Sequence, residues 1–321
     1  MAWFSTTAWT DTLSKNIEES VDLIMSNNES LLSEGGLSYS NLNKEQKFDT
    51  TQKVTIDNRE ILYNVIEFSM NSITPGMAPI EARTQPIRGL IIIYSDGTQI
   101  QYIINRNSDA LKLLRKLLNY TTKNEIIENK LSFTDDTFMW FVKAVFDEDS
   151  EFSFTDSNQN EQSLIINSII GVRGETRDEN KLSAQGDTVL NLISTLSFIL
   201  ESNLLKQIVL RIEYTGHENI EIRLNDKGVV AVEVDAYSGN YEDLSDEYQL
   251  KAQTLLLVYL DILPKLLQEY YVQKDAEKWN NLVKDAFFDS VQSKLIARLQ
   301  QRKREVEAEQ ISLLSHVEGI V

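Results

Sequence analysis

The stretch IVLRIEYTGHENIEIRLNDKGVVAVEVDAY, residues 208–237, indicates the fold more strongly than any other part of the sequence. Apolar and polar residues alternate along three short runs, and such alternation is typical of half-buried β-strands. The runs are Ile208–Tyr214, Asn219–Leu224 and Val229–Tyr237, joined by the turn-rich residues 215–218 and 225–228. Because strands joined by short turns pair antiparallel, the sequence predicts a three-stranded meander.

The alternation gives this meander two different faces. One face is apolar and holds Ile208, Leu210, Ile212, Ile220, Ile222, Leu224, Val230, Val232 and Val234. The other face is polar and holds Glu213, Glu221, Glu233 and Asp235 beside Arg211 and Arg223. Antiparallel sheets commonly pack one face on a core and leave the other in water. We therefore expect helices against the apolar face and solvent against the acidic one.

Helices are predicted downstream of the meander. Ser245, followed by Asp246 and Glu247, is typical of a helix start, and helical patterning continues from there through the rest of the sequence. Pro264 lacks a backbone N–H, so we expect a kink or a break near Leu263.

A second β-rich region precedes the meander. Residues 54–65 predict a hairpin with Asp57-Asn58 at its tip, and residues 90–104 predict another around Ser95–Thr98. Hydrophobic spacing predicts helices over residues 9–24, 108–118, 134–146 and 187–200. Polar or proline-containing connectors are expected at 27–43, 75–86 and 173–187.

These elements predict an α+β fold in which antiparallel hairpins and meanders are packed by helices, with a helical C-terminal region. A length of 321 residues suggests two domains. The acidic, polar stretch 147–162 is the expected boundary, which gives an N-terminal domain at 1–150 and a C-terminal domain at 160–321.

Composition excludes several kinds of chemistry. The chain has no cysteine and only two histidines, His217 and His316, so thiolate, disulfide and thiolate-zinc chemistry is absent and imidazole catalysis is disfavoured. Both histidines are expected to be ordinary surface residues. A formal charge of −18 repels phosphates and anionic lipids, which disfavours generic nucleic-acid or membrane binding. No signal peptide or spanning segment is expected, and the predicted location is the cytoplasm.

Three groups of residues are candidates for a functional site. The first comprises the acids Glu213, Glu221, Glu233 and Asp235, whose oxygens are of the type that holds Mg²⁺. The second is the loop 173–187, where Arg173, Glu175, Arg177, Asp178 and Asp187 are candidate ligand-binding residues. The third is a basic stripe of Lys294, Arg298, Arg302, Lys303 and Arg304, a candidate contact for a partner or a nucleic acid. Nearby opposite charges also explain the acids and the stripe as ordinary solvated surface.

The sequence favours a non-enzymatic cytoplasmic protein that acts through protein–protein contacts, such as an accessory or regulatory subunit, with a protein partner or a homo-oligomer expected. No cofactor is predicted. One alternative is a carboxylate-based, Mg²⁺-dependent hydrolase or nuclease. Another is nucleic-acid binding through the stripe at 294–304.

Overall fold

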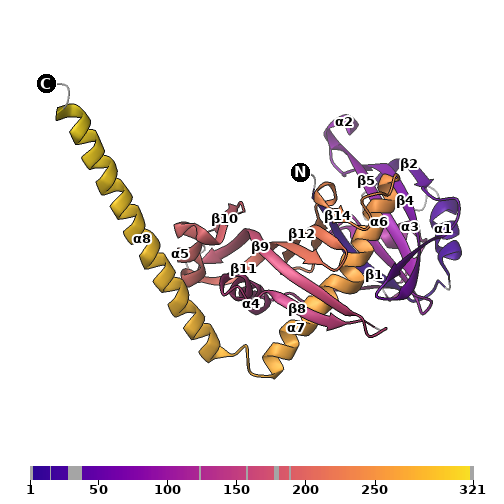
Figure 1. Cartoon of the computed structure of the whole chain (residues 1–321). Coiled ribbons are helices and arrows are strands. Elements are labelled where there is room, and N and C mark those ends of the chain that lie inside the picture. Colours follow the sequence, from indigo (N-terminus) through magenta and orange to yellow (C-terminus); the bar gives the residue numbers. More distant parts are fainter. Residues whose placement is uncertain are drawn as a thin grey trace. The chain divides into compact units, whose positions relative to one another are not determined.

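The computed structural model describes residues 3–14, 16–27, 38–122, 124–156, 158–176, 181–187 and 189–318. The fold is α+β, as predicted, with antiparallel strands, several helices and a long C-terminal helix (Figure 1). Within the described residues, no helix is both long enough and apolar enough to cross a membrane.

The chain divides into two compact units, and each is made of three separate stretches. Unit 1 comprises Met1–Phe133, Glu151–Ile165 and Ile212–Lys265. Unit 2 comprises Thr134–Ser150, Ile166–Arg211 and Leu266–Val321. The units therefore interleave along the sequence. The division into domains at 1–150 and 160–321 stays a prediction.

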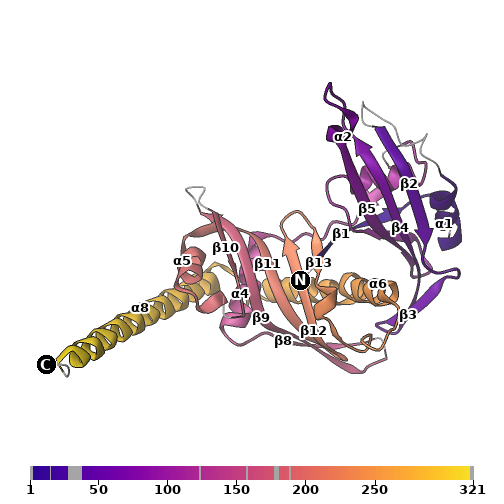
Figure 2. The same ribbon diagram turned by 90° about the horizontal axis from the view of Figure 1, so that it is seen from above.

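Unit 1 contains most of the strands. Its elements are β1 (Phe4–Asp11), α1 (Ile17–Ser26), β2 (Ser38–Gln46), β3 (Gln52–Ile56), β4 (Arg59–Ile73), α2 (Ile80–Arg83), β5 (Thr84–Ser95), β6 (Ile100–Ile104), α3 (Ala110–Leu117), β7 (Ile126–Glu128), β8 (Glu151–Thr155), β12 (His217–Asn225), β13 (Val230–Val232), β14 (Ser238–Gly239) and α6 (Glu247–Leu257). Figure 2 shows β2, β4 and β5 side by side, in line with their pairing. Every printed strand pair in this unit is antiparallel, including the two predicted hairpins, β3–β4 and β5–β6.

The strand β1 joins the two β-rich regions of unit 1. Its first residues pair with β13, where Phe4 lies opposite Val232, and its later residues pair with β6, where Trp9 lies opposite Tyr102. The predicted helix over residues 9–24 is therefore wrong in its first half, and only α1 is helical. Trp9 and Leu13 match helical spacing by coincidence, whereas the Thr-rich and aromatic run FSTTAWT suits a strand.

Two predicted connectors also contain strands. The described part of 27–43 includes the start of β2, which pairs with β4 over residues 38–46. Pro86 lies within β5, opposite Asn71. Only the short stretch between β4 and β5, which includes α2, connects elements as expected. Polar composition led to the first error and the prolines to the second, because a strand segment paired on one side only needs neither apolar residues nor every backbone N–H.

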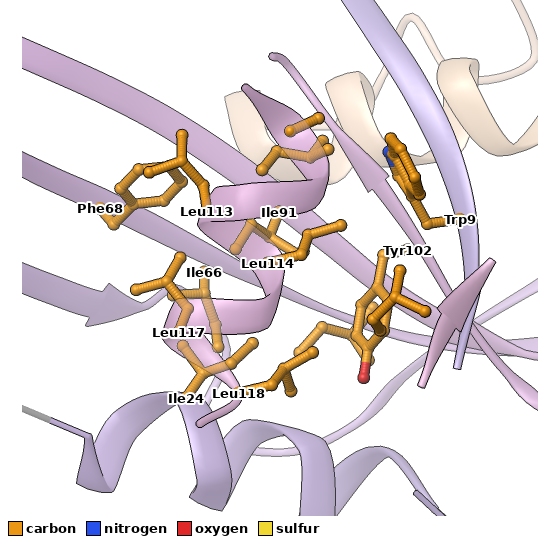
Figure 3. Close-up of a cluster of buried hydrophobic side chains, with 14 of the residues drawn as sticks. Trp9, Ile24, Ile66, Phe68, Ile91, Tyr102, Leu113, Leu114, Leu117 and Leu118 are labelled. Carbon is orange, nitrogen blue, oxygen red and sulfur yellow. The ribbon is translucent and has the colours of Figure 1, made fainter. Parts of the chain in front are cut away.

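A core of apolar side chains fills the space between the strands β4–β6 and the helices α1 and α3 (Figure 3). Leu113, Leu114 and Leu117 of α3 and Ile24 of α1 are almost fully buried there. Ile66, Phe68, Ile91 and Tyr102 meet them from the strands.

Unit 2 is largely helical and holds α4 (Asp135–Phe146), β10 (Lys181–Gln185), a 3₁₀ turn (Val189–Asn191), α5 (Ile193–Glu201) and α8 (Asn281–Glu318). Thr134 caps α4 through a capping box with Thr137, at the start of the helix predicted over 134–146. Behind it, Asp136 accepts hydrogen bonds from Tyr270 (2.5 Å), Lys274 and Trp279 (both 3.2 Å). Burial acts to raise the pKa of Asp136, but hydrogen bonds from Lys284, Tyr270 and Lys274 lower it to about 2.

Three elements belong to both units, namely β9 (Glu161–Thr176), β11 (Ser202–Tyr214) and α7 (Leu263–Asp275). The expected break near Leu263 takes the form of one π-helical stretch, Val258–Ile262, between α6 and α7. The wider π turn accommodates the missing N–H of Pro264 without ending the helical path.

Candidate functional site

The predicted ligand-binding loop is a β-hairpin, so the expectation of a structureless connector at 173–187 is wrong. β9 continues to Thr176 and pairs with β10, which places Arg173 opposite Ser183 and Glu175 opposite Lys181. Lys206 Nζ lies 2.6 Å from Glu175, and Arg211 lies 3.0 Å from Asp187. Arg177 and Asp178 lie outside the described residues. A ligand-binding role for these residues stays a prediction.

The four candidate metal ligands do not share one environment. Glu221 and Glu233 are 6% and 1% exposed, whereas Glu213 and Asp235 are exposed. The polar face of the meander is therefore not solvated throughout, because the N-terminal segment covers part of it, with the guanidinium of Arg223 4.8 Å from the Trp3 ring centroid. No group of three or more His, Asp or Glu side chains among the described residues is placed to hold a metal ion.

The basic stripe lies on α8, mostly beside neutralising or apolar groups. Lys294 Nζ lies 4.4 Å from the ring centroid of Phe146. Arg302 lies 3.3 Å from Glu305, and Lys303 lies 3.9 Å from Glu307. Arg298 is half-buried and Arg304 is exposed. Neighbouring acids thus dilute the positive field that a nucleic-acid contact needs.

Unit 1 has a surface cleft of about 750 Å³ that the sequence did not predict. Its lining residues are Glu151, Ser163, Ile165, Glu213, Tyr214, Thr215, Gly216, His217, Glu218, Gly239, Asn240, Glu242 and Asp243. Five of them are acids, and none of these lining residues, all within the described chain, is a lysine or an arginine. A cleft of this composition has a negative potential that attracts cations.

The turn between β11 and β12 forms one wall of the cleft, and hydrogen bonds hold it against β9. Ser163 N donates to Thr215 Oγ1 (2.8 Å), and Thr215 N donates back to Ser163 O (3.1 Å). Ser163 Oγ also donates to Glu151 Oε1 (3.2 Å). Two hydrogen bonds in opposite directions fix the turn, so the wall is rigid before any ligand arrives.

β14 pairs with the start of β12 beside this turn, and the contact depends on two glycines. Gly216 has a φ of +81°, and its carbonyl accepts a hydrogen bond from Asn240 N (2.9 Å). Gly239 has a φ of +141°, and a Cβ there would lie 2.6 Å from His217 Cα. Only glycine permits this backbone to approach so closely. The acids Glu242 and Asp243 come directly after this contact and so face the cleft.

Aromatic side chains form the floor. His217, only 6% exposed, packs against Tyr214, Tyr237 and Tyr241, with ring centroids 6.2, 5.8 and 4.9 Å away. Burial lowers the pKa of His217 to about 4, although the charge of Asp261 acts in the opposite direction. His217 is therefore neutral at pH 7, contrary to the expectation of an ordinary surface histidine. His316 has no described side chain.

The proton of His217 can be placed from its hydrogen bonds. Tyr237 OH lies 2.5 Å from His217 Nδ1 and accepts a hydrogen bond from Tyr241 N (3.1 Å). Because burial raises the pKa of Tyr237 to about 12, its hydroxyl keeps a proton, which it donates to Nδ1. In the tautomer that matches this direction, the imidazole proton resides on Nε2, for which the described residues show no hydrogen bond. Nε2–H is a donor available to a ligand.

A buried polar cluster lies beneath the floor. Tyr214 OH donates to Asp261 Oδ2 (2.6 Å) and accepts from Lys265 Nζ (2.6 Å). Lys265 also pairs with the same carboxylate, and both side chains are nearly buried. Asp261 belongs to the π-helical stretch, so this turn positions the carboxylate. Burial, together with Asp261, raises the pKa of Tyr214 far above its usual value, so the phenol stays neutral.

These features define a rigid, acidic and partly aromatic cleft. It can hold a cation through its carboxylates and a carbonyl oxygen through His217 Nε2–H. The acid-rich run from Glu242 to Glu247 is the one hint of this cleft, but nothing in the sequence indicates that this run meets the β11–β12 turn. No protein-family model matches the sequence, and no curated protein matches it.

Proposed function

We propose that this is a non-enzymatic cytoplasmic protein that acts through protein–protein contacts, and that its acidic cleft holds a basic segment of a protein partner. The observation that carries the proposal is the lining of the cleft. Five carboxylates and a neutral histidine face one hollow without a lysine or arginine among the lining residues. A peptide with Lys or Arg side chains supplies both the cations and the carbonyl oxygens that such a lining recognises.

The size of the cleft fits this type of ligand. A volume of about 750 Å³ is within the range of about 300–1,000 Å³ that is typical of ligand sites. Four of the cleft's acids come from two segments, Glu213 and Glu218 beside the β11–β12 turn and Glu242 and Asp243 after β14.

The two alternatives lack an observation of this kind. The described residues hold no cluster of His, Asp or Glu that could hold a metal ion, so a Mg²⁺-dependent hydrolase stays a prediction from sequence. Nucleic-acid binding through α8 also stays a prediction, since acids accompany two of the five basic residues.

Isothermal titration with an acetylated Lys-Arg-Lys peptide tests the proposal. We expect the triple variant Glu213→Gln/Glu242→Gln/Asp243→Asn to weaken binding by about tenfold, since each exposed ion pair contributes about 0.2–1 kcal/mol. The matched control Glu81→Gln/Glu128→Gln/Asp226→Asn removes the same charge from exposed sites elsewhere in unit 1. Equal weakening in both variants means attraction to the overall charge of the protein, and contradicts a specific cleft.

A further inference from the structure

The first part of the C-terminal helix α8 is packed against the rest of unit 2, whereas its distal half is not. Phe287 and Val291 are 2% and 0% exposed, and Phe287 packs edge-on against Phe146 of α4. From Leu299 to Ala308, by contrast, every described side chain is exposed. Figures 1 and 2 both show α8 passing α5 and continuing away from the rest of unit 2. The distal half therefore has no described neighbour within its own unit.

Apolar residues form a stripe along this distal half. Ile296, Leu299 and Val306 are 47%, 49% and 37% exposed and are spaced by three and seven residues. The same spacing continues in the sequence to Leu313 and Val317, with Lys303 and Gln310 at the intervening positions. Spacings that alternate between three and four are the heptad pattern of a coiled-coil seam. Lys303 at a seam position weakens pairing but fixes its register.

A lone helical arm is a weak structure in water. Helices shorter than about 15 residues are marginal without tertiary contacts. The described support within the arm consists of exposed charge pairs such as Arg302–Glu305 and Lys303–Glu307, which stabilise a helix only slightly. An apolar stripe that nothing covers adds the cost of exposing it to water. A helix along this seam would remove that cost.

The charge order along the arm selects the partner. A basic stretch from Lys294 to Arg304 is followed at once by Glu305, Glu307 and Glu309. If two copies of α8 pair antiparallel about a point between Arg304 and Glu305, the basic residues 302–304 of each lie along the acidic residues 305–309 of the other. Arg302 is then level with Glu307 of the second copy. Parallel pairing instead places Lys303 of each copy against Lys303 of the other at the seam, and this like-charge contact destabilises a coiled coil.

We propose that the distal half of α8 is a dimerisation arm, which pairs antiparallel with α8 of a second copy of this chain. The contact is isologous, because each copy presents the same seam and the same two charge blocks. The pairing spans about three heptads, or about 33 Å of helix. An association of this length in the micromolar range brings two acidic clefts into one assembly. The proposal does not depend on what the clefts bind.

Sedimentation equilibrium of the full chain over a range of concentrations tests the association. We expect a monomer–dimer equilibrium in which Leu299→Asp/Val306→Asp raises the dissociation constant at least about tenfold, since both changes bury a charge in the seam. The matched control Ala297→Asp/Ala308→Asp adds the same charge to exposed positions off the stripe, and should change dissociation far less. An unchanged near-ultraviolet spectrum confirms that both variants fold. A monomer at every concentration, or equal effects of the two variants, overturns the proposal.

A single spin label tests the direction of pairing, because the chain has no cysteine of its own. With the label at Ala297→Cys, antiparallel pairing separates the two labels by about 22 Å along the axis. Parallel pairing would hold them within about 15 Å, close to the spacing of the helices. A long distance in the dimer supports the antiparallel arm. A short distance, or a dimer in which the labels report no contact between arms, overturns it.

Discussion

At the scale of single residues, His217 links the stability of the protein to pH. Its pKa is lowered from 6.5 to about 4 by burial, so below pH 6.5 the unfolded chain binds a proton that the folded chain does not. Stability attributable to this group is therefore complete above pH 6.5 and is lost as the pH falls toward 4. The slope for one group is about 1.4 kcal/mol per pH unit.

Urea unfolding at pH 7 and pH 5 measures this effect. We expect the protein to lose about 2 kcal/mol more than the variant His217→Gln, which has no proton to bind in this range. Carboxylates contribute equally to both proteins, so the difference isolates the imidazole. Equal losses in the two proteins would show that His217 titrates normally and is not desolvated.

Alanine substitutions at two glycines with the same φ distinguish the cost of backbone strain from the cost of steric overlap. Gly239 and Gly186 both have a φ of +141°, but a Cβ at Gly186 would have no atom within 4 Å, whereas one at Gly239 would meet the backbone of His217. We expect Gly186→Ala to cost about 1 kcal/mol and Gly239→Ala about 2–3 kcal/mol more. Thermal unfolding of the two variants compares them directly. Similar melting temperatures would mean that the cleft wall moves apart easily.

The burial of His217 shows where prediction from the sequence ends at this scale. A histidine between a glycine and a glutamate in a turn is normally exposed. It is buried here because Tyr237 and Tyr241 fold back over it, after a β-bulge in the pairing of β12 with β14. That register is set by tertiary contacts and leaves no pattern in the local sequence.

At the scale of secondary-structure elements, the buried pair Asp261–Lys265 stabilises the π-helical stretch between α6 and α7. Because both groups are nearly buried, removing one leaves an uncompensated charge, and a cost of about 3–5 kcal/mol is expected for Lys265→Met. The double variant Asp261→Asn/Lys265→Met should cost less than the sum of its two singles. Equilibrium unfolding of the four proteins gives this coupling energy.

The exposed pair Lys303–Glu307 has the same spacing of four residues and serves as the control. A double-mutant cycle for this pair, with Lys303→Met and Glu307→Gln, should give a coupling energy below about 0.5 kcal/mol in the monomer. Coupling energies of similar size in the two cycles would mean that water reaches Asp261.

Elements were predictable where local residues determine them. The helix that begins after Thr134, the hairpins around Asp57-Asn58 and Asp96-Gly97, and the first two meander strands are all local, and all are present. The third predicted strand, 229–237, is only partly right, because β13 covers Val230–Val232 and residues 234–236 form a 3₁₀ turn. The strands β2 and β10 were missed because they are polar and gain their structure by pairing with β4 and β9. Their backbones are held by hydrogen bonds to the neighbouring strand, and their side chains do not lie in the core. Apolar and polar residues therefore alternate only weakly along them.

At the scale of the whole molecule, the interleaved units predict what a shortened chain can do. A fragment of residues 1–150 lacks β13, which pairs with Phe4–Thr6, and lacks Tyr259, whose hydroxyl lies 3.0 Å from Thr6 Oγ1. We expect this fragment to show no cooperative unfolding transition, whereas a chain ending at Ala308 should keep one. Cooperative unfolding of residues 1–150 would instead support an independent N-terminal domain.

The pairing of β1 on both sides also affects how the protein is made on the ribosome. Residues 4–6 reach the end of the exit tunnel early, yet their partner strand ends at Val232. At synthesis rates of about 5–20 residues per second, this strand edge has no partner strand for on the order of 10–50 seconds. During that time its backbone N–H and C=O groups are open to any other strand. The newly made chain is thus expected to need protection by a chaperone at its N-terminal edge until the meander emerges.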